Sequence, residues 1–125
     1  MMVYSLAVAM GGALGALSRY WLMLWIGSLA GTRLPWGTAL VNVLGSVAIG
    51  LLYVLISERL LLSEQWRGLL VVGYLGAFTT FSTFSLDTLL LLQEGRWLAA
   101  LGYVAGSVLL CLTGAWLGML LMRAL

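Results

Sequence analysis

The chain has 125 residues, of which 63% are apolar and only 8% are charged. A soluble domain carries about 25% charged residues, and a disordered chain combines low hydrophobicity with high charge, so both classes are excluded. The net charge of +2 comes without a basic run, which argues against nucleic acid as a partner. One cysteine, Cys111, and no histidine exclude a disulfide framework within one chain, a histidine-based triad and most catalytic metal sites. The composition predicts a small integral membrane protein that is not an enzyme.

The spacing of the charges predicts four membrane spans. A hydrocarbon core about 30 Å thick needs about 20 apolar residues in a helix, and the charged residues divide the chain into four stretches of that length. We therefore predict an all-α transmembrane protein, with residues 1–125 as one domain. The expected helices cover about 3–28, 35–56, 67–92 and 98–122, and an amphipathic link, Glu58–Arg67, joins the second helix to the third.

The first two predicted helices carry small residues and a few isolated polar groups. Gly11 and Gly15 are four residues apart, and such pairs let helix backbones approach closely in a membrane. Arg19 places a permanent positive charge toward the end of the first helix. Pro35 suits the first turn of the second helix, where a missing N–H costs little. Asn42, the only asparagine, lies midway along that helix and offers two N–H donors.

The third predicted helix contains the most unusual stretch, Gly73–Ser85. All three phenylalanines and five serines and threonines lie within it. Hydroxyl groups at mid-membrane depth must be hydrogen-bonded or face water. Gly73 and Gly76, followed by residues that compete for backbone hydrogen bonds, favour a broken helix. Irregular backbone at this depth occurs only inside protein or along a water-filled path. A pore or transport site is therefore predicted here in preference to a simple helix interface with core aromatics.

The polar groups near this stretch favour an anion over a cation. Phe81 and Phe84 are three residues apart, so their rings share one helical face. Aromatic rings have electropositive edges and electronegative faces, and an anion meets the edges. Asn42 and Arg19 add donors, whereas Asp87 is the only acidic residue within a predicted helix. These arguments favour an anion path but do not identify the anion.

The fourth predicted helix and the distribution of arginines indicate an oligomer. Glycines recur along the helix at Gly102, Gly106, Gly114 and Gly118, more than one four-helix bundle needs. The arginines expected on the side of the termini are Arg59, Arg67 and Arg123, and those on the other side are Arg33 and Arg96, with Arg19 close by. This near-balance gives almost no orientation signal. It fits either one topology held by other factors or insertion in both orientations with antiparallel pairing.

Three motifs together resemble the Fluc (CrcB) family of fluoride channels. They are the glycine-rich segment Gly11–Tyr20, the segment Gly37–Ser46 and the stretch Gly73–Ser85, whose run of threonines, serines and phenylalanines is the most distinctive. The resemblance spans nearly the whole chain. Two departures are minor: Asp87 stands where many relatives have glutamate, and Ala77–Phe78 replaces a commonly smaller or aliphatic pair.

The resemblance implies an antiparallel, dual-topology homodimer in the cell inner membrane, with two pores for passive fluoride efflux. Phe81 and Phe84 would be ring-edge ligands of fluoride. The remaining residues implied along the fluoride path are Asn42, Ser82, Thr83, Tyr103, Ser107, Arg19 at a vestibule and Asp87 near the end of the track. A structural sodium ion at the dimer centre would be bound by the backbone carbonyls of Gly76 and Thr79.

A small proton-coupled multidrug-resistance transporter is the main alternative, because it also has four helices and dual topology. Proton-coupled export of cations needs a titrating carboxylate in the membrane, and in that family the carboxylate lies in the first helix. The first predicted helix here has no acidic residue, and Asp87 lies close to the end of the third. A purely structural assembly subunit, the third possibility, would not explain the hydroxyls and rings concentrated at one site.

Overall fold

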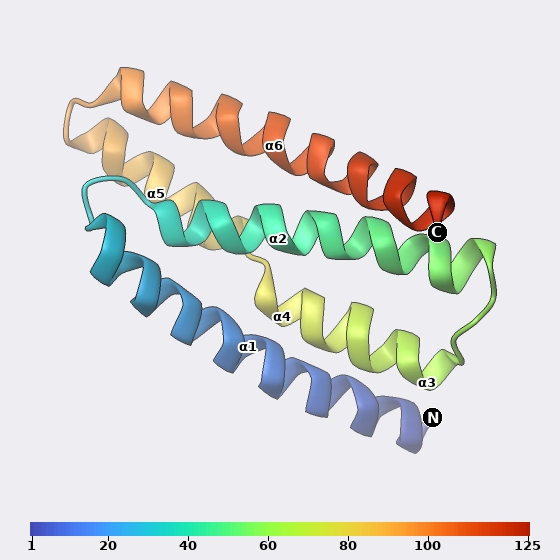
Figure 1. The fold of residues 1–125 in the computed structure, drawn as a ribbon. Coiled ribbons are helices and arrows are strands. Elements are labelled where there is room, and N and C mark those ends of the chain that lie inside the picture. The colour runs from blue at the N-terminus through green and yellow to red at the C-terminus, as the bar shows by residue number, and fades with distance from the viewer.

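Four long apolar helical spans lie side by side in the computed structural model, which describes all residues Met1–Leu125 (Figure 1). Each is long and apolar enough to cross a membrane, which confirms the prediction of four spans. The spans are Met2–Ala30, Trp36–Glu58, Glu64–Gln93 and Trp97–Ala124. Both termini lie at the same end of the bundle (Figure 1), as expected for an even number of spans.

Two of the four spans are divided into shorter helical segments. The elements in chain order are α1 (Met2–Ala30), α2 (Trp36–Tyr53), the π-helical turn η1 (Val54–Glu58), α3 (Glu64–Arg67), the π-helical segment η2 (Gly68–Leu75), α4 (Gly76–Phe78), α5 (Phe81–Gln93) and α6 (Trp97–Ala124). The third span thus consists of α3, η2, α4 and α5. This division matters because the functional groups lie where α4 ends and α5 begins.

The predicted link Glu58–Arg67 is wrong in its extent. Glu58 ends η1 and Glu64 already begins α3, so only residues 59–63 are non-helical. Ser63 has extended backbone angles and precedes α3. Glu64 lies in the first turn, where its negative charge complements the helix dipole. The polar residues that suggested a link therefore begin the third span.

Glycines let the backbones of neighbouring spans approach closely. A Cβ atom at Gly11 or Gly15 of α1 would overlap the carbonyl oxygen of Leu69 or Tyr74 in η2. On the other side of the bundle, a Cβ atom at Gly50 of α2 would overlap the carbonyl oxygen of Ala115 in α6. These contacts join α1 to the third span and α2 to α6, as small-residue faces do in membranes.

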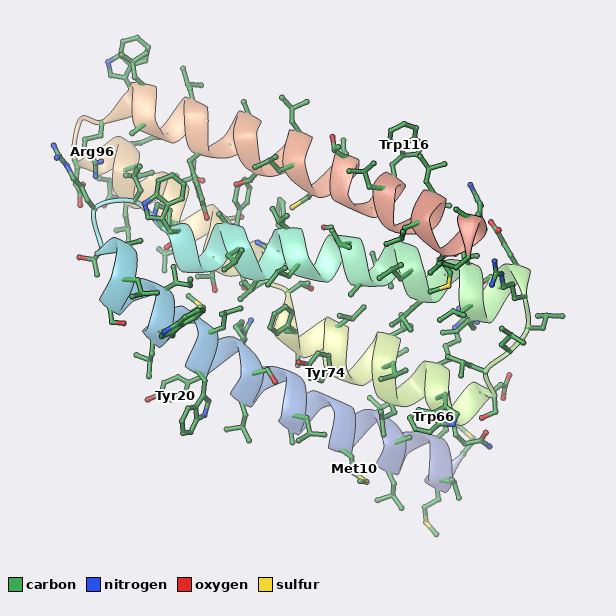
Figure 2. All side chains as sticks on the ribbon, in the orientation of Figure 1. Met10, Tyr20, Trp66, Tyr74, Arg96 and Trp116 are labelled. Atoms are coloured by element: carbon green, nitrogen blue, oxygen red, sulfur yellow. The ribbon has the colours of Figure 1, made fainter.

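The outer surface of the bundle is apolar, and the buried interior is small. Only 17 of the 125 residues are buried, so most large apolar side chains face outward, where lipid would surround them. Met10 and Tyr20 project from the outer side of α1 and Trp116 from that of α6, whereas Tyr74 lies where α1 faces the third span (Figure 2). Packing in this protein therefore depends on close backbone contacts more than on a large apolar core.

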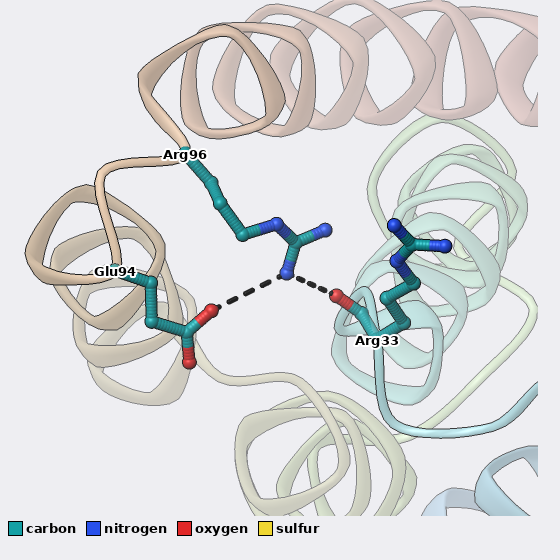
Figure 3. Close-up of polar contacts among 3 residues, drawn as sticks. All are labelled: Arg33, Glu94 and Arg96. Carbon is teal, nitrogen blue, oxygen red and sulfur yellow. Dashed lines mark hydrogen bonds and ion pairs between the residues drawn. The ribbon is translucent and has the colours of Figure 1, made fainter.

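Polar contacts tie the spans together at both ends of the bundle. At the end with the termini, the Arg123 guanidinium donates from Nε to Glu58 Oε2 at 3.0 Å. At the opposite end, Arg96 Nη1 donates to the Arg33 carbonyl oxygen at 2.6 Å and lies 3.4 Å from Glu94 Oε2 (Figure 3). These exposed contacts add little stability, but they connect residues that are distant in the chain at each end of the bundle.

We predict that Gly15→Ala destabilises the protein by about 1–3 kcal/mol, because the new methyl group must push the Tyr74 main chain away from α1. Gly12→Ala is the matched control, since a Cβ atom at Gly12 meets nothing within 4 Å, and we expect a change within about 0.5 kcal/mol. The measurement is the free energy of unfolding in detergent micelles. Equal losses in the two variants would contradict this account of the contact between α1 and η2.

Candidate functional site

Two extended residues separate α4 from α5 in the third span. Thr79 has φ −84° and ψ 159°, and Thr80 has φ −154° and ψ 118°. Helical geometry therefore ends at Phe78 and resumes at Phe81, and the connection is visible as a short uncoiled segment between α4 and α5 (Figure 1). We refer to Thr79 and Thr80 as the break.

The break redirects two backbone donors away from their helical acceptors. The Thr80 N–H donates to Asn42 Oδ1 at 2.8 Å, and the Thr83 N–H donates to Thr80 Oγ1 at 3.1 Å. In an uninterrupted α-helix, each N–H bonds to the carbonyl four residues earlier, which would be Gly76 and Thr79. Both carbonyl oxygens therefore lose the donor that a continuous helix would supply.

The chemistry of these two carbonyls is compatible with the sodium site that the family resemblance implies. Uncharged carbonyl oxygens at the end of a helix suit a small hard cation. Gly76 and Thr79 are the two residues expected to bind sodium, although Arg19 Nη1 also donates to the Thr79 carbonyl oxygen, at 3.4 Å. The structure has no group of three or more histidine, cysteine or acidic residues that could hold a metal. The sodium site stays a prediction.

Asn42 connects α2 to the break through both ends of its carboxamide. Its Oδ1 accepts from the Thr80 N–H, and its Nδ2 donates to the Thr80 carbonyl oxygen at 2.9 Å. The break comes this close to α2 because Gly45 has no side chain: a Cβ atom there would overlap the Thr79 methyl group. Ser46 in turn donates to the Asn42 carbonyl oxygen at 2.7 Å.

Thr80 caps the N-terminus of α5 and gathers hydroxyl groups around it. Its Oγ1 donates to Thr83 Oγ1 at 3.0 Å and lies 3.3 Å from Ser82 Oγ. The first N–H groups of a helix have no helical partner and carry the positive end of the helix dipole. Hydroxyl groups and a partial positive charge therefore meet at the start of α5, which favours a nearby anion.

Three aromatic rings form a row that leads away from the break, two from α5 and one, Tyr103, from α6. The Phe81 and Phe84 ring centroids are 5.4 Å apart, and those of Phe84 and Tyr103 are 5.2 Å apart. Both pairs are tilted by about 40° between ring planes. The Tyr103 hydroxyl donates to Asp87 Oδ2 at 3.3 Å. The prediction that Phe81 and Phe84 share one face is confirmed, and the row of rings ends at the one acidic residue of α5.

Several of the predicted residues line one open cavity of about 530 Å³ between α2, the break and α6. Its polar and aromatic lining residues are Asn42, Ser46, Thr79, Thr80, Phe81, Phe84, Ser107 and Cys111. Asp87 lies instead at a separate cavity of about 270 Å³ near Arg33 and Arg96, and Tyr103 and Ser107 line a third. Arg19, Ser82 and Thr83 line none of these three cavities.

Sequence reasoning missed the roles of Thr80 and Gly45. Thr80 appears in the distinctive motif, but nothing in the sequence singles it out from Thr79 or Thr83. A threonine just before a helix, whose hydroxyl oxygen accepts from the N–H three residues later, is an N-cap. This role could be recognised only once the start of α5 was known. Gly45 is adjacent to Ser46 in the second motif. A glycine is required there because Thr79 packs against it, and the sequence does not reveal that contact.

We predict that Gly45→Ala lowers the free energy of unfolding and that adding Thr79→Ser restores much of the lost stability. The added methyl group at Gly45 would overlap Thr79 Cγ2, and serine lacks that methyl group while keeping the hydroxyl that donates to the Leu75 carbonyl oxygen. We expect a loss of about 1–3 kcal/mol for Gly45→Ala alone and a smaller loss for the double variant. A double-mutant cycle of unfolding free energies measures the coupling, and additive effects would contradict the contact.

Comparison with known proteins identifies the family. The family model described as CrcB-like protein, Camphor Resistance (CrcB), matches residues 6–119. A protein of Magnetococcus marinus named fluoride-specific ion channel FluC is 51% identical over 116 residues, which cover 93% of this chain and 94% of that protein. Proteins with the same name from Hahella chejuensis and Chloroflexus aurantiacus are 47% and 53% identical, over 93% and 82% of this chain and 91% and 82% of their own lengths. On this evidence from sequence, the chain belongs to the CrcB family.

Proposed function

We propose that this protein is a fluoride channel that lets fluoride leave the cytoplasm passively. The observation that carries this proposal is the row of Phe81, Phe84 and Tyr103 rings that begins at the capped N-terminus of α5. The rings offer electropositive edges, and the helix start offers N–H groups and hydroxyls. Family relatives named as fluoride-specific channels support the choice of anion.

This lining suits an anion that holds its water tightly. Fluoride enters a pore only if the lining replaces much of its hydration, and it leaves only if no group binds it too strongly. Hydroxyl groups and ring edges donate partial positive charge without a formal charge. The cavity that contains Phe81 and Phe84 has no acidic or basic residue in its lining. A path of this kind would favour passage over trapping.

The other predicted residues have different roles in this proposal. Asn42 has one N–H left for an anion after its bond to the Thr80 carbonyl oxygen. The other side chains proposed along the path are Ser82, Thr83, Tyr103 and Ser107, with Asp87 near its end. Arg19, a permanent cation beside the break, would raise the local concentration of anions at a vestibule. No part of the proposal requires enzyme chemistry.

We further propose that the working unit is an antiparallel homodimer with both orientations in the inner membrane. Phe81, the first ring of the row, is 78% exposed in one chain, so a second copy could complete the path. A Cβ atom at Gly102 or Gly106 of α6 would meet nothing within 4 Å, which leaves room for close approach of another helix. A sodium ion held by Gly76 and Thr79 of both subunits would supply positive charge between them.

We predict that Phe81→Ile and Phe84→Ile keep the fold and lose most fluoride flux, because isoleucine keeps apolar bulk but has no ring edge. Phe78→Ile is the matched control within the same motif. Phe78 is buried at 7% exposure and stacks on Tyr74, with ring centroids 5.8 Å apart, so its loss acts on packing instead of the path.

The measurement is fluoride efflux from proteoliposomes at matched protein incorporation, with the folded fraction of each variant determined in parallel. We expect Phe78→Ile to keep most flux per folded protein. Full flux in both Phe81→Ile and Phe84→Ile would refute the ring-edge path. An equal loss per folded protein in all three variants would point to packing instead.

For the topology, we predict that a C-terminal tag is found on both sides of the membrane in one preparation. The near-balance of arginines gives each chain little preference for either orientation. Tag accessibility in intact and permeabilised vesicles measures the distribution. In a companion variant, two lysines added between Arg59 and Ser63 should force every chain into one orientation and reduce fluoride efflux. A tag found on one side only, with full activity, would exclude the antiparallel dimer.

A further inference from the structure

We propose that Asn42 is a positioning residue, which fixes the break and thereby the start of α5 and the two rings that α5 carries. This inference rests on the proposed fluoride path for its functional consequence, but its geometry does not. Asn42 Oδ1 accepts from the Thr80 N–H at 2.8 Å, and Asn42 Nδ2 donates to the carbonyl oxygen of the same residue at 2.9 Å. One side chain thus holds both main-chain polar groups of one residue.

The two bonds resemble the pairing between neighbouring β-strands and suit the extended backbone of Thr80. That residue is 7% exposed, so its N–H and carbonyl groups have little access to water. Buried main-chain groups without partners are unfavourable. Because a helical partner is absent at the break, Asn42 supplies what the helix would have supplied. A carboxamide has a donor and an acceptor on one rigid plane, which no hydroxyl or carboxylate reproduces at this position.

The support for Asn42 comes from a rigid part of α2. Val41, the preceding residue, is fully buried, and Gly45 allows the break to come into contact with α2. The Ser46 hydroxyl donates to the Asn42 carbonyl oxygen at 2.7 Å. The position of the carboxamide is therefore set by contacts of α2 within one chain.

A chain of contacts carries this position from α2 to the rings. Asn42 holds the backbone of Thr80, and Thr80 Oγ1 accepts from the Thr83 N–H at 3.1 Å. That bond caps α5, which begins at Phe81. The rings of Phe81 and Phe84 then follow from the start of the helix. If Thr80 moves, the cap is lost, and the first turn of α5 loses its fixed orientation.

The competing explanation is that Asn42 only lines the path and donates to the anion. The two explanations differ at the Thr83 amide, which Asn42 does not contact. A lining role leaves the Thr83 N–H bonded to Thr80 Oγ1 when Asn42 is replaced. A positioning role predicts that this amide loses protection from hydrogen exchange.

The test is site-resolved hydrogen exchange by NMR on the full-length protein in lipid, with fluoride flux measured on the same samples. For Asn42→Leu, we expect exchange at the Thr83 amide to rise about tenfold or more, while exchange at Leu109 in the middle of α6 stays unchanged. Asn42→Ser, a smaller polar residue that is too short to reach Thr80, should show the same pattern and guards against misfolding of the leucine variant.

Two further variants calibrate the measurement. Thr80→Val removes the acceptor of the Thr83 N–H directly and sets the full size of the effect. Ser107→Ala removes a hydroxyl group from the same cavity without touching the break, so it should lower flux and leave the Thr83 amide protected.

Loss of flux in both Asn42 variants with unchanged exchange at Thr83 would overturn the positioning role. An equal rise at Thr83 and Leu109 would show general destabilisation and would overturn it as well. The outcome is separable from the proposed function: a wild-type protein that carries no fluoride would refute the channel, whereas the exchange pattern at Thr83 would still report whether Asn42 fixes the break.

Discussion

The pair of hydrogen bonds between the Asn42 carboxamide and the main chain of Thr80 is the interaction on which the site depends. It lets the third span leave helical geometry for two residues without leaving Thr80 unpaired. A new helix then starts at Phe81, capped by the Thr80 hydroxyl. The carbonyls of Gly76 and Thr79 without helical donors and the N-terminus of α5 both result from this one interruption. Opposite partial charges are thus separated within a few residues.

Close backbone packing makes that interaction possible. Gly45 brings the break against α2, while Gly11 and Gly15 bring α1 against η2. Such contacts substitute for the large apolar core of a soluble protein, because lipid offers no hydrophobic gain for burying leucine. The residues freed from core packing form an outer apolar surface, and the few polar side chains gather at the break and at the ends of the bundle.

Charge spacing and hydropathy predicted the four spans well, because bilayer thickness constrains the length of every span. The shared face of Phe81 and Phe84 was equally predictable, since it depends on local helical periodicity alone. The extent of the link Glu58–Arg67 was wrong, because its polar residues suit a helix terminus as well as a loop. The partners of Asn42 could not be predicted, since they depend on the register between α2 and the third span.

The most direct test of the central claim is the ion selectivity of the purified wild-type protein in liposomes. Efflux of fluoride and chloride and uptake of a cationic drug under a proton gradient would be compared at matched protein incorporation. The account predicts fluoride efflux faster than chloride efflux, because family relatives are named as fluoride-specific channels. It predicts no drug uptake, because α1 and α2 have no titrating carboxylate. Equal rates for fluoride and chloride, or drug uptake driven by protons, would contradict it.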